Sequence, residues 1–174
     1  MKKGKLILLN GVSSSGKTTI AKELLKHLPD YFYCGLDNFD LLIEQMEERE
    51  IRHLIPVETE YFFHRTIRMF SDKGINLIVD HVIDNPFARA DCRESLAGYP
   101  VLFVGVHCPL AELEQREKER GDRRLGQARE QLAFVHQGEA YDVEVDSVGD
   151  GLATCANKIL QRVEAADFPQ AWLF

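Results

Sequence analysis

The chain lacks the features that mark several common classes of protein. No stretch of its 174 residues approaches the roughly 20 consecutive apolar residues that a membrane-spanning helix needs. Its formal net charge is −7, from 21 Lys plus Arg against 28 Asp plus Glu, which argues against a nonspecific nucleic-acid coat and against an anionic membrane surface. We therefore expect no nucleic-acid partner and no membrane partner, so any anionic ligand must be bound by a local arrangement of residues.

The cysteines form no pattern that predicts a disulfide framework or a zinc site. Cys34, Cys92, Cys108 and Cys155 are widely spaced, with no CxxC pair and no companion histidine at zinc-finger spacing. A free cysteine usually behaves as a small buried hydrophobic residue. We therefore expect these cysteines to be reduced and buried, and none of them to hold a metal.

Internal repeats, low-complexity tracts and Pro/Gly/Ser-rich linkers are also missing, so nothing marks a domain boundary. With 45% hydrophobic residues the chain can bury one substantial core, and a single domain over residues 1–174 is predicted. The start MKKGKLILLN has a basic end, but its apolar run stops after a few residues, which favours a first strand over an export signal. A cytoplasmic location is the resulting expectation.

Short apolar runs alternate with longer amphipathic segments along the chain. The runs predict strands at Leu6–Asn10, Phe32–Leu36, Asn76–Val82, Val101–His107 and Asp142–Asp146. Several of these runs are apolar on both faces, as parallel strands are when helices cover each side. The pattern predicts a three-layer, doubly wound α/β fold with a five-stranded parallel sheet. Functional residues should then lie at the carboxyl ends of the strands.

A glycine-bounded loop, GVSSSGKTT, follows the first predicted strand directly and precedes a helical pattern. The loop satisfies G-x-x-x-x-G-K-[ST], in which backbone N–H groups and a helix N-terminus hold nucleotide phosphates. The alternative is a Gly/Ser loop with a solvated lysine. We predict that ATP binds here and that Lys17 reaches its β- and γ-phosphates. The predicted nucleotide-binding residues of the loop are Gly11, Val12, Ser13, Ser14, Ser15, Gly16, Lys17, Thr18 and Thr19.

A Mg²⁺ site is predicted beside this loop. The hydroxyl of Thr18 is one expected ligand, because the serine or threonine of this motif binds the ion. Asp80, at the end of the apolar strand INLIVD, is the second, acting directly or through a metal-bound water. The alternative for Asp80 is a plain aspartate that ends a strand.

Proteins with this loop differ in the molecule that accepts the γ-phosphate of the bound nucleotide. A GTPase needs an N-K-x-D reader of guanine, and NKIL at residues 157–160 lacks the aspartate. A small-molecule kinase needs a base near the acceptor hydroxyl. Asp37, after the second predicted strand, is the candidate base, and capping of the next helix is its alternative role. Asp40 lies one helical turn further on, and exposure on that helix is its preferred interpretation.

The same chemistry needs cations over the γ-phosphate, and QREKERGDRRLG supplies a cluster of arginines. In a helix, Arg116, Arg120 and Arg123 share one stripe. Two glycines bracket the segment, which predicts a mobile lid at about residues 116–127. Ion pairs with the glutamates of the helix are the alternative role, and the preferred one for Arg124.

Four segments together resemble the chloramphenicol phosphotransferase family of P-loop kinases: GVSSSGKT, GLD, REKERGDRRLGQA and VHQGEAYDVEVDS. Their order and spacing match from Leu6 to about Ser147. The resemblance implies the P-loop nucleoside triphosphate hydrolase fold and ATP-dependent transfer of phosphate to a primary hydroxyl of an antibiotic. It also implies Asp37 as the base, Arg120 and Arg123 on the phosphates, and Arg116 stacked on adenine.

The segments that would select the acceptor depart from the family pattern, since His81 stands where the pattern has a second acid. The acceptor is left open between a chloramphenicol-like antibiotic and a nucleoside, sugar or amino sugar. A noncatalytic ATP-binding switch is the rival from another class. The candidate acceptor contacts are His81, Asp84 and Arg65 for polar groups, and Met46, Phe62, Phe63 and Phe70 for apolar groups, with core packing as the preferred alternative for these last four.

Two further features have no assigned chemistry. His136 and Tyr141 match the family pattern, and bracing of the lid or of the last strand is their expected role. The tail DFPQAWLF is expected to pack back onto the domain, and a contact within a homo-oligomer is its open alternative.

Overall fold

The computed structural model describes residues 2–46, 58–121, 124–165 and 168. Within these residues, five parallel strands form one sheet in the order β2-β3-β1-β4-β5. Their bounds are β1 Leu6–Asn10, β2 Tyr31–Gly35, β3 Asn76–His81, β4 Val101–His107 and β5 Val143–Asp146. The five predicted strands are confirmed, each to within one residue at either end.

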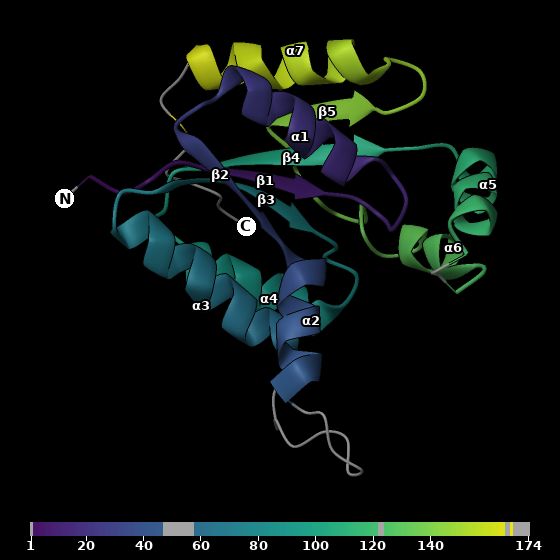
Figure 1. Ribbon diagram of the computed structural model, residues 1–174, viewed down its shortest axis with the longest axis horizontal. Coiled ribbons are helices and arrows are strands. Elements are labelled where there is room, and N and C mark those ends of the chain that lie inside the picture. The colour runs from purple at the N-terminus through teal and green to yellow at the C-terminus, as the bar shows by residue number, and fades with distance from the viewer. Residues whose placement is uncertain (1, 47–57, 122–123, 166–167, 169–174) are drawn as a thin grey trace.

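Helices cover both faces of this sheet. They are α1 Lys17–His27, α2 Leu36–Met46, α3 Thr59–Asp72, α4 Pro86–Leu96, α5 Leu110–Arg120, α6 Gln127–Leu132 and α7 Leu152–Glu164. Helices α1 and α7 pack together on one face, and α3 packs with α4 on the other, with α2 against α3 (Figure 1). Helices α5 and α6 lie together beyond the carboxyl ends of the strands (Figure 1). The predicted three-layer α/β fold is confirmed.

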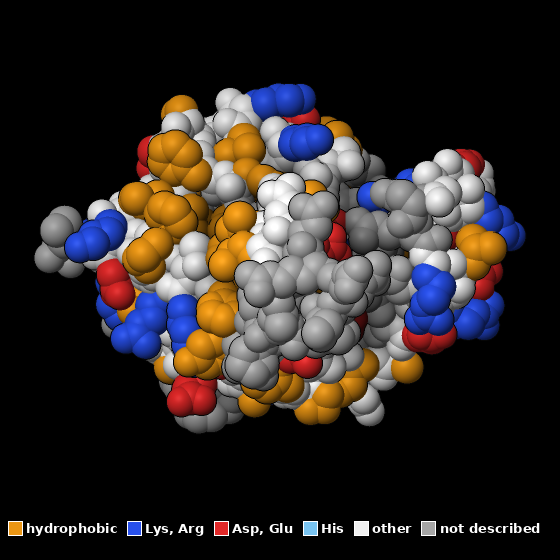
Figure 2. All heavy atoms as spheres, turned by 60° about the horizontal axis from the view of Figure 1, so that its bottom comes forward, with side chains coloured by type: hydrophobic (Ala, Val, Ile, Leu, Met, Phe, Trp, Pro, Cys, Tyr) orange, Lys and Arg blue, Asp and Glu red, His pale blue; other side chains and the backbone are white. Residues whose placement is uncertain are grey.

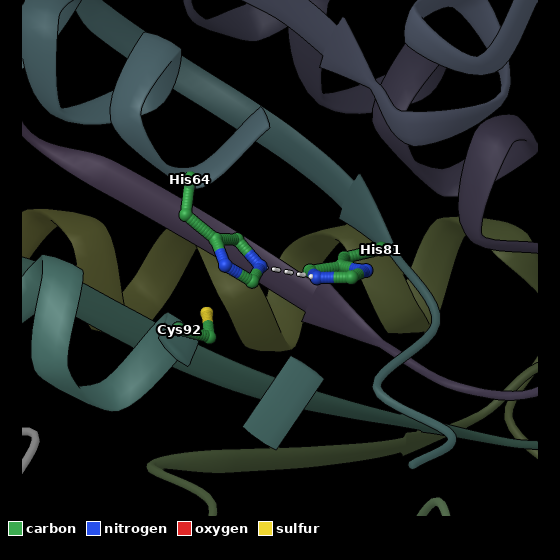
Figure 3. Close-up of side chains that lie close together, drawn as sticks. All are labelled: His64, His81 and Cys92. Carbon is green, nitrogen blue, oxygen red and sulfur yellow. Dashed lines mark hydrogen bonds between the residues drawn. The ribbon is translucent and has the colours of Figure 1, made fainter. Parts of the chain in front are cut away.

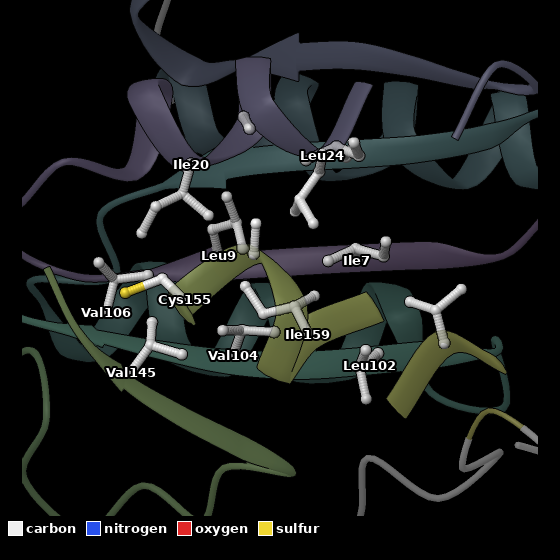
Figure 4. Close-up of a cluster of buried hydrophobic side chains, with 14 of the residues drawn as sticks. Ile7, Leu9, Ile20, Leu24, Leu102, Val104, Val106, Val145, Cys155 and Ile159 are labelled. Atoms are coloured by element: carbon white, nitrogen blue, oxygen red, sulfur yellow. The ribbon is translucent and has the colours of Figure 1, made fainter. Parts of the chain in front are cut away.

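Two core clusters lie on opposite faces of the sheet, because successive side chains of a strand alternate between its faces. Ile7 and Leu9 pack with the apolar stripe of α1 and with side chains of α7 (Figure 4). Leu6 and Leu8 pack instead with Phe63 and other side chains of α3 and α4. Burial of both faces explains why the central strands are continuous apolar runs rather than alternating ones.

The strand order brings the ends of distant strands together. β1 pairs with β3 on one side and with β4 on the other, and Leu9 lies opposite Asp80 in this register. The loop after β1 is therefore flanked by the end of β3. In an open parallel sheet, the crevice outside these carboxyl ends is where ligands bind.

Several further expectations can be compared with the structure. All four cysteines are free; three are buried, as predicted, and Cys34 is half-buried. None of the described helices is long and apolar enough to cross a bilayer. The short helix α6 was not predicted, and it begins at the end of the segment that was predicted as a lid. Arg123 and the tail from residue 169 lie outside the described residues, so the roles given to them stay predictions.

Candidate active site

A cavity of about 600 Å³ opens at the carboxyl ends of the strands. The phosphate loop and the first turn of α1 form one side of it. Its other charged lining residues come from the first turns of α2 and α3, from β3 and the loop that follows, and from α5. The cavity thus collects residues that lie more than 100 positions apart in the sequence, at the edge where the fold predicts a site.

The phosphate loop has backbone conformations that most residues avoid. Gly16 has a φ of 97° and Ser14 a φ of 63°, both in the left-handed region. A Cβ at Gly11 would lie 2.5 Å from the carbonyl oxygen of Val106, so only glycine fits there. No described side chain caps the N-terminus of α1, and its first residues line the cavity. Uncapped N–H groups and the positive end of the helix dipole therefore face this space, as an anion site requires.

Lys17 and Thr18 meet Asp80 beside this loop. The Lys17 Nζ atom donates to the carbonyl oxygen of Val12 at 2.9 Å and lies 3.8 Å from Asp80 Oδ1. The Thr18 hydroxyl donates to Asp80 Oδ2 at 2.6 Å. The two residues predicted as metal ligands are therefore in direct contact, although 62 positions separate them.

Tyr33 belongs to the same group, and the sequence reasoning missed it. Its hydroxyl donates to Asp80 Oδ2 at 3.1 Å from the neighbouring strand β2. Burial, and then the nearby charge of Asp80, raise the pKa of the Tyr33 phenol above its ordinary value. Tyr33 therefore stays neutral and serves as a hydrogen-bond donor that orients the carboxylate. An aromatic residue two positions before the end of a strand gives no signal of this role.

Asp37 and Asp40 both line the cavity from α2. Asp37 lies in the first turn of this helix, where a negative charge interacts favourably with the helix dipole. Asp37 is the second residue of α2, inside the helix rather than before it, and its role as base stays a prediction. The preferred interpretation of Asp40 was wrong, because Asp40 is half-buried in the cavity wall rather than exposed on the helix. One helical turn brings both carboxylates to the same side of α2.

The arginine segment divides into separate environments. Arg116 Nη1 donates to the carbonyl oxygen of Ser14 at 3.1 Å, and its Nε donates to Glu112 at 2.8 Å, so this side chain lies over the phosphate loop. Arg120 lines the cavity as well. Arg124 pairs with Glu130 of α6 rather than with a glutamate of its own segment. Basic and acidic side chains lie side by side at this end of the molecule (Figure 2).

A buried glutamate ties the ends of this segment together. Glu117 is 1% exposed, and its carboxylate accepts the backbone N–H groups of Gly126 at 2.9 Å and of Ala128 at 2.6 Å. Gly121 ends α5 with a φ of 69°, and Gly126 precedes α6 with a φ of 84°. Both glycines are thus needed for the turns at the two ends of the segment.

Gln131 links the phosphate loop to the far side of the cavity, and the sequence reasoning did not identify it. The backbone N–H of Ser13 donates to Gln131 Oε1 at 2.8 Å, and Gln131 Nε2 donates to Asp84 Oδ2 at 3.0 Å. All three residues line the cavity. The candidate acceptor contact Asp84 is therefore coupled to the loop through one amide. Gln131 lies 118 positions after Ser13, so no local pattern signals the contact.

The structure separates the other candidate acceptor contacts from the cavity. His81 is buried against His64 of α3, and Arg65 is bound to Asp91, so neither lines the cavity. Phe63 and Phe70 belong to the core, as their alternative interpretation held. Met46 and Phe62, the other two candidates for apolar acceptor contacts, do not line the cavity either. Met46 is 63% exposed. The charged residues that line the cavity instead include Glu60, which was not singled out.

His136 and Tyr141 brace the segment that follows α6. The His136 Nδ1 atom and the Tyr141 hydroxyl are 2.7 Å apart, and Asn10 Nδ2 donates to the same hydroxyl at 3.0 Å. The Tyr141 ring lies over Gly105, where a Cβ would come within 2.6 Å of it. Asn10 ends β1 and also donates to Val135, so these contacts tie the central strand to the segment after the lid. This agrees with the bracing role expected from the sequence.

Comparison with known proteins places the chain in a family. The model of the chloramphenicol phosphotransferase-like protein family matches residues 4–164. Two provisionally named O-phosphotransferases of Mycobacterium tuberculosis, from strains CDC 1551 and H37Rv, are each 30% identical to it over 197 aligned positions. These alignments cover 99% of this chain and 88% of each relative.

Two solved structures share the fold. The tunicamycin resistance protein of Deinococcus radiodurans has a TM-score of 0.72 and 20% identity, over 94% of this chain and 98% of that one. The APS kinase of M. tuberculosis, in complex with AMPPNP and APS, has a TM-score of 0.68 and 17% identity, over 95% of this chain and 100% of that one. They confirm the P-loop kinase fold, and the family match confirms the resemblance first noted in the sequence. The chain belongs to the chloramphenicol phosphotransferase-like family, and it is a small-molecule kinase.

Proposed function

We propose that this protein transfers the γ-phosphoryl group of ATP to a hydroxyl group of a small polar molecule. One observation carries the proposal: a single cavity joins the phosphate loop and Lys17 to the carboxylate of Asp37. A nucleotide whose phosphates lie on the loop would present its last phosphorus to the space in front of that carboxylate. An acceptor hydroxyl in this space could lose its proton to Asp37 as its oxygen attacks.

The proposed reaction assigns each bond and each proton. The acceptor oxygen forms a bond to the γ-phosphorus, and the bond from this phosphorus to the β–γ bridging oxygen breaks. The proton of the acceptor hydroxyl passes to the Asp37 carboxylate, and ADP leaves with the bonding electron pair. Lys17 and Arg120, together with Arg123 by family resemblance, offset the negative charge on the transferred group. Arg116 is proposed to contact the adenine, as the family resemblance implies.

The residues beside the loop fit Mg²⁺. This ion prefers oxygen ligands, and the Thr18 hydroxyl and the Asp80 carboxylate are oxygen donors that already meet at 2.6 Å. Bound there, Mg²⁺ would offset charge on the β- and γ-phosphate oxygens. Tyr33 would keep the carboxylate oriented through its hydrogen bond.

The acceptor side of the cavity favours a particular class of acceptor. Asp37, Asp40, Glu60 and Asp84 all line it. Burial, with the nearby charges of Asp40, Glu58 and Asp84, raises the pKa of the Glu60 carboxyl. Such a surface favours acceptors that carry an amine or several hydroxyls. An amino sugar or other polyol is therefore our second candidate beside a chloramphenicol-like antibiotic.

A substitution at Asp37 tests the proposed mechanism. Asp37→Asn keeps the size of the side chain but removes the base, so kcat should fall roughly 10²- to 10⁴-fold while ATP still binds. ATP binding is measured by calorimetry and phosphate transfer by mass spectrometry of the acceptor. Asp30→Asn, which changes a carboxylate outside this cavity, is the matched control and should keep its activity. Equal loss of ATP binding and of transfer in Asp37→Asn would assign this residue to folding instead.

An acceptor screen tests the activity itself. The protein is incubated with Mg²⁺, ATP and a panel that includes chloramphenicol, amino sugars, nucleosides and simple sugars. We expect one class of hydroxylated molecule to gain the mass of a phosphoryl group, and amine-bearing members to react faster than neutral ones. ATP binding without phosphorylation of any acceptor would favour the noncatalytic switch.

A further inference from the structure

Among the described residues, three side chains with metal-ligating atoms meet on the face of the sheet that α3 and α4 cover. They are His64 of α3, His81 at the end of β3 and Cys92 of α4 (Figure 3). One ligand atom from each lies within 4.8 Å of the other two, and each residue is at most 1% exposed. Three different elements therefore converge at one buried point.

The hydrogen bonds of His64 direct a lone pair toward this point. Its Nδ1 atom lies 2.6 Å from Asp91 Oδ2. A carboxylate can only accept, so Nδ1 carries the proton and the neutral ring keeps its lone pair on Nε2. That Nε2 atom lies 2.7 Å from Nε2 of His81 (Figure 3). A histidine whose other nitrogen donates to a carboxylate is the usual arrangement of a metal ligand.

The carboxylate is itself held in place. Arg65 Nη1 donates to Asp91 Oδ1 at 2.9 Å and to Oδ2 at 3.1 Å. Arg65 also stacks on the ring of Tyr61, with its guanidinium carbon 3.3 Å from the ring centroid. An outer layer of support of this kind fixes the orientation of the imidazole before any ion arrives. These contacts run from the partly exposed Arg65 through Asp91 to the buried ring of His64.

We propose that His64, His81 and Cys92 form a second metal site, specific for a borderline or soft ion such as Zn²⁺ and distinct from the oxygen-donor site at Thr18. Two imidazole nitrogens and a thiolate are ligands that Zn²⁺ takes and that Mg²⁺ does not. Sequence spacing did not predict the site, because its ligands come from three elements at positions 64, 81 and 92.

Binding requires the two imidazole rings to separate slightly and the Cys92 sulfur, within 4.8 Å of both nitrogens, to reach the same ion. Two nitrogens bound to one tetrahedral zinc ion at about 2.0 Å stand roughly 3.3 Å apart. The two Nε2 atoms are now 2.7 Å apart, so the imidazoles separate by about half an ångström. The ion replaces the N–H···N bond between the rings: the His81 proton moves from Nε2 to Nδ1, and the Cys92 proton leaves to solvent. The ion then joins α3, β3 and α4 and makes this face of the molecule more stable.

Metal analysis of the full-length protein tests the proposal. Protein expressed in zinc-supplemented medium and then dialysed should retain about one zinc ion per chain. Cys92→Ala should retain less, with at least about tenfold lower affinity, whereas Cys155→Ala, which removes another buried cysteine, should match the wild type. Adding Zn²⁺ should raise the unfolding temperature of metal-free wild type and not that of Cys92→Ala. Adding Mg²⁺ should not reproduce the rise.

A second variant keeps all three ligands in place. Asp91→Asn preserves the size of the side chain but weakens the hydrogen bond to His64, so zinc affinity should fall about 10- to 100-fold. Cobalt substitution adds a spectroscopic readout, since a Co²⁺–thiolate absorption band should form in the wild type and be absent in Cys92→Ala. Zinc content that is equally low in the wild type and in Cys92→Ala, with no thermal response to Zn²⁺ after refolding in its presence, would overturn the proposal.

Discussion

Asp80 and His81 are consecutive residues of β3, yet they belong to different environments. Asp80 faces the α1 side of the sheet, where it meets Thr18, Tyr33 and Lys17. His81 faces the α3 side, where it meets His64. Alternation along the strand sends one side chain to each face. A single step along the backbone therefore separates the proposed chemistry of the reaction from a buried cluster of a different kind.

The two faces also differ in the ligands that they offer. The Asp80 side presents oxygen atoms next to a cavity of about 600 Å³ and suits a hard, hydrated cation. The His81 side presents nitrogen and sulfur atoms away from solvent and suits a softer ion held by the protein alone. The contrast teaches that adjacent polar residues of a buried strand should not be assigned to one site. Their separation can be tested by changing each face alone.

Asp80→Asn should have the largest effect. The substitution keeps the shape of the side chain but removes the charge that the Thr18 and Tyr33 hydroxyls contact. We expect kcat to fall about 10³-fold, or roughly 4 kcal/mol of barrier, because charge complementarity around the phosphates carries most of the catalysis. The rate of phosphate transfer to the acceptor found in the screen, measured at saturating substrate, gives kcat. A variant with near-normal kcat would show that Asp80 only ends the strand.

His81→Ala should lower the stability of the protein more than its activity, the opposite of Asp80→Asn. It removes a fully buried ring and leaves His64 Nε2 without its hydrogen-bond partner. The free energy of unfolding should fall by roughly 3 kcal/mol, measured by urea denaturation with a chelator present. The loss of kcat should be at least about tenfold smaller than in Asp80→Asn, because the two side chains lie on opposite faces. Equal losses of activity in the two variants would contradict the conclusion that Asp80 and His81 act in separate environments.

Gln131→Ala should have a moderate effect on activity alone. The change removes the amide that links the backbone of Ser13 to Asp84. One hydrogen bond contributes about 1 kcal/mol, so kcat/KM for the acceptor should fall about tenfold or less. Gln137→Ala, an exposed glutamine outside the cavity, serves as the control. Unchanged kinetics in Gln131→Ala would mean that the link is broken once substrates bind.

The smallest predicted effect is on pH dependence. Burial lowers the pKa of His136 to about 4, with His107 and Lys17 adding to the shift and Glu144 opposing it. The unfolded value is about 6.5, so the stability that this group contributes is present above that pH and is lost as pH falls toward 4. His136→Gln should therefore show a shallower loss of stability over this range in urea titrations. A slope identical to that of the wild type would assign the acid sensitivity to other groups, such as His64.

Local patterns predicted the strands and the phosphate loop well, for a physical reason. A strand buried on both faces must be apolar along its whole length, and a loop that wraps phosphates needs glycine where a Cβ would collide, as at Gly11. These constraints act within a few residues. Asp37 and Asp80 were also found from the sequence, because the carboxyl end of a parallel strand is where a site forms.

Contacts across the fold could not be predicted in this way. The sequence gives no measure of whether a side chain on α2 turns toward a cavity or toward water, and Asp40 was assigned wrongly for that reason. His81 was one candidate for an acceptor contact, but the strand register turns it to the α3 face of the sheet. Gln131 and Tyr33 act through partners on other elements, and their positions depend on the strand order and on the docking of α6.

The two hydrogen bonds that the buried Glu117 carboxylate accepts from Gly126 and Ala128 restrict how the arginine segment can move. If Gly121 and Gly126 acted as independent hinges, two hydrogen bonds would break and a buried carboxylate would lose its donors, at a cost of at least about 1–3 kcal/mol. A motion that carried α5 and α6 together would keep both of these bonds, but it would break the hydrogen bonds that Gln131 and Arg116 make with the phosphate loop. Arg116 and Arg120 lie on the same helix and both line the cavity, so any displacement of α5 would move the two side chains together. Opening of the cavity and withdrawal of these two cations would thus be coupled.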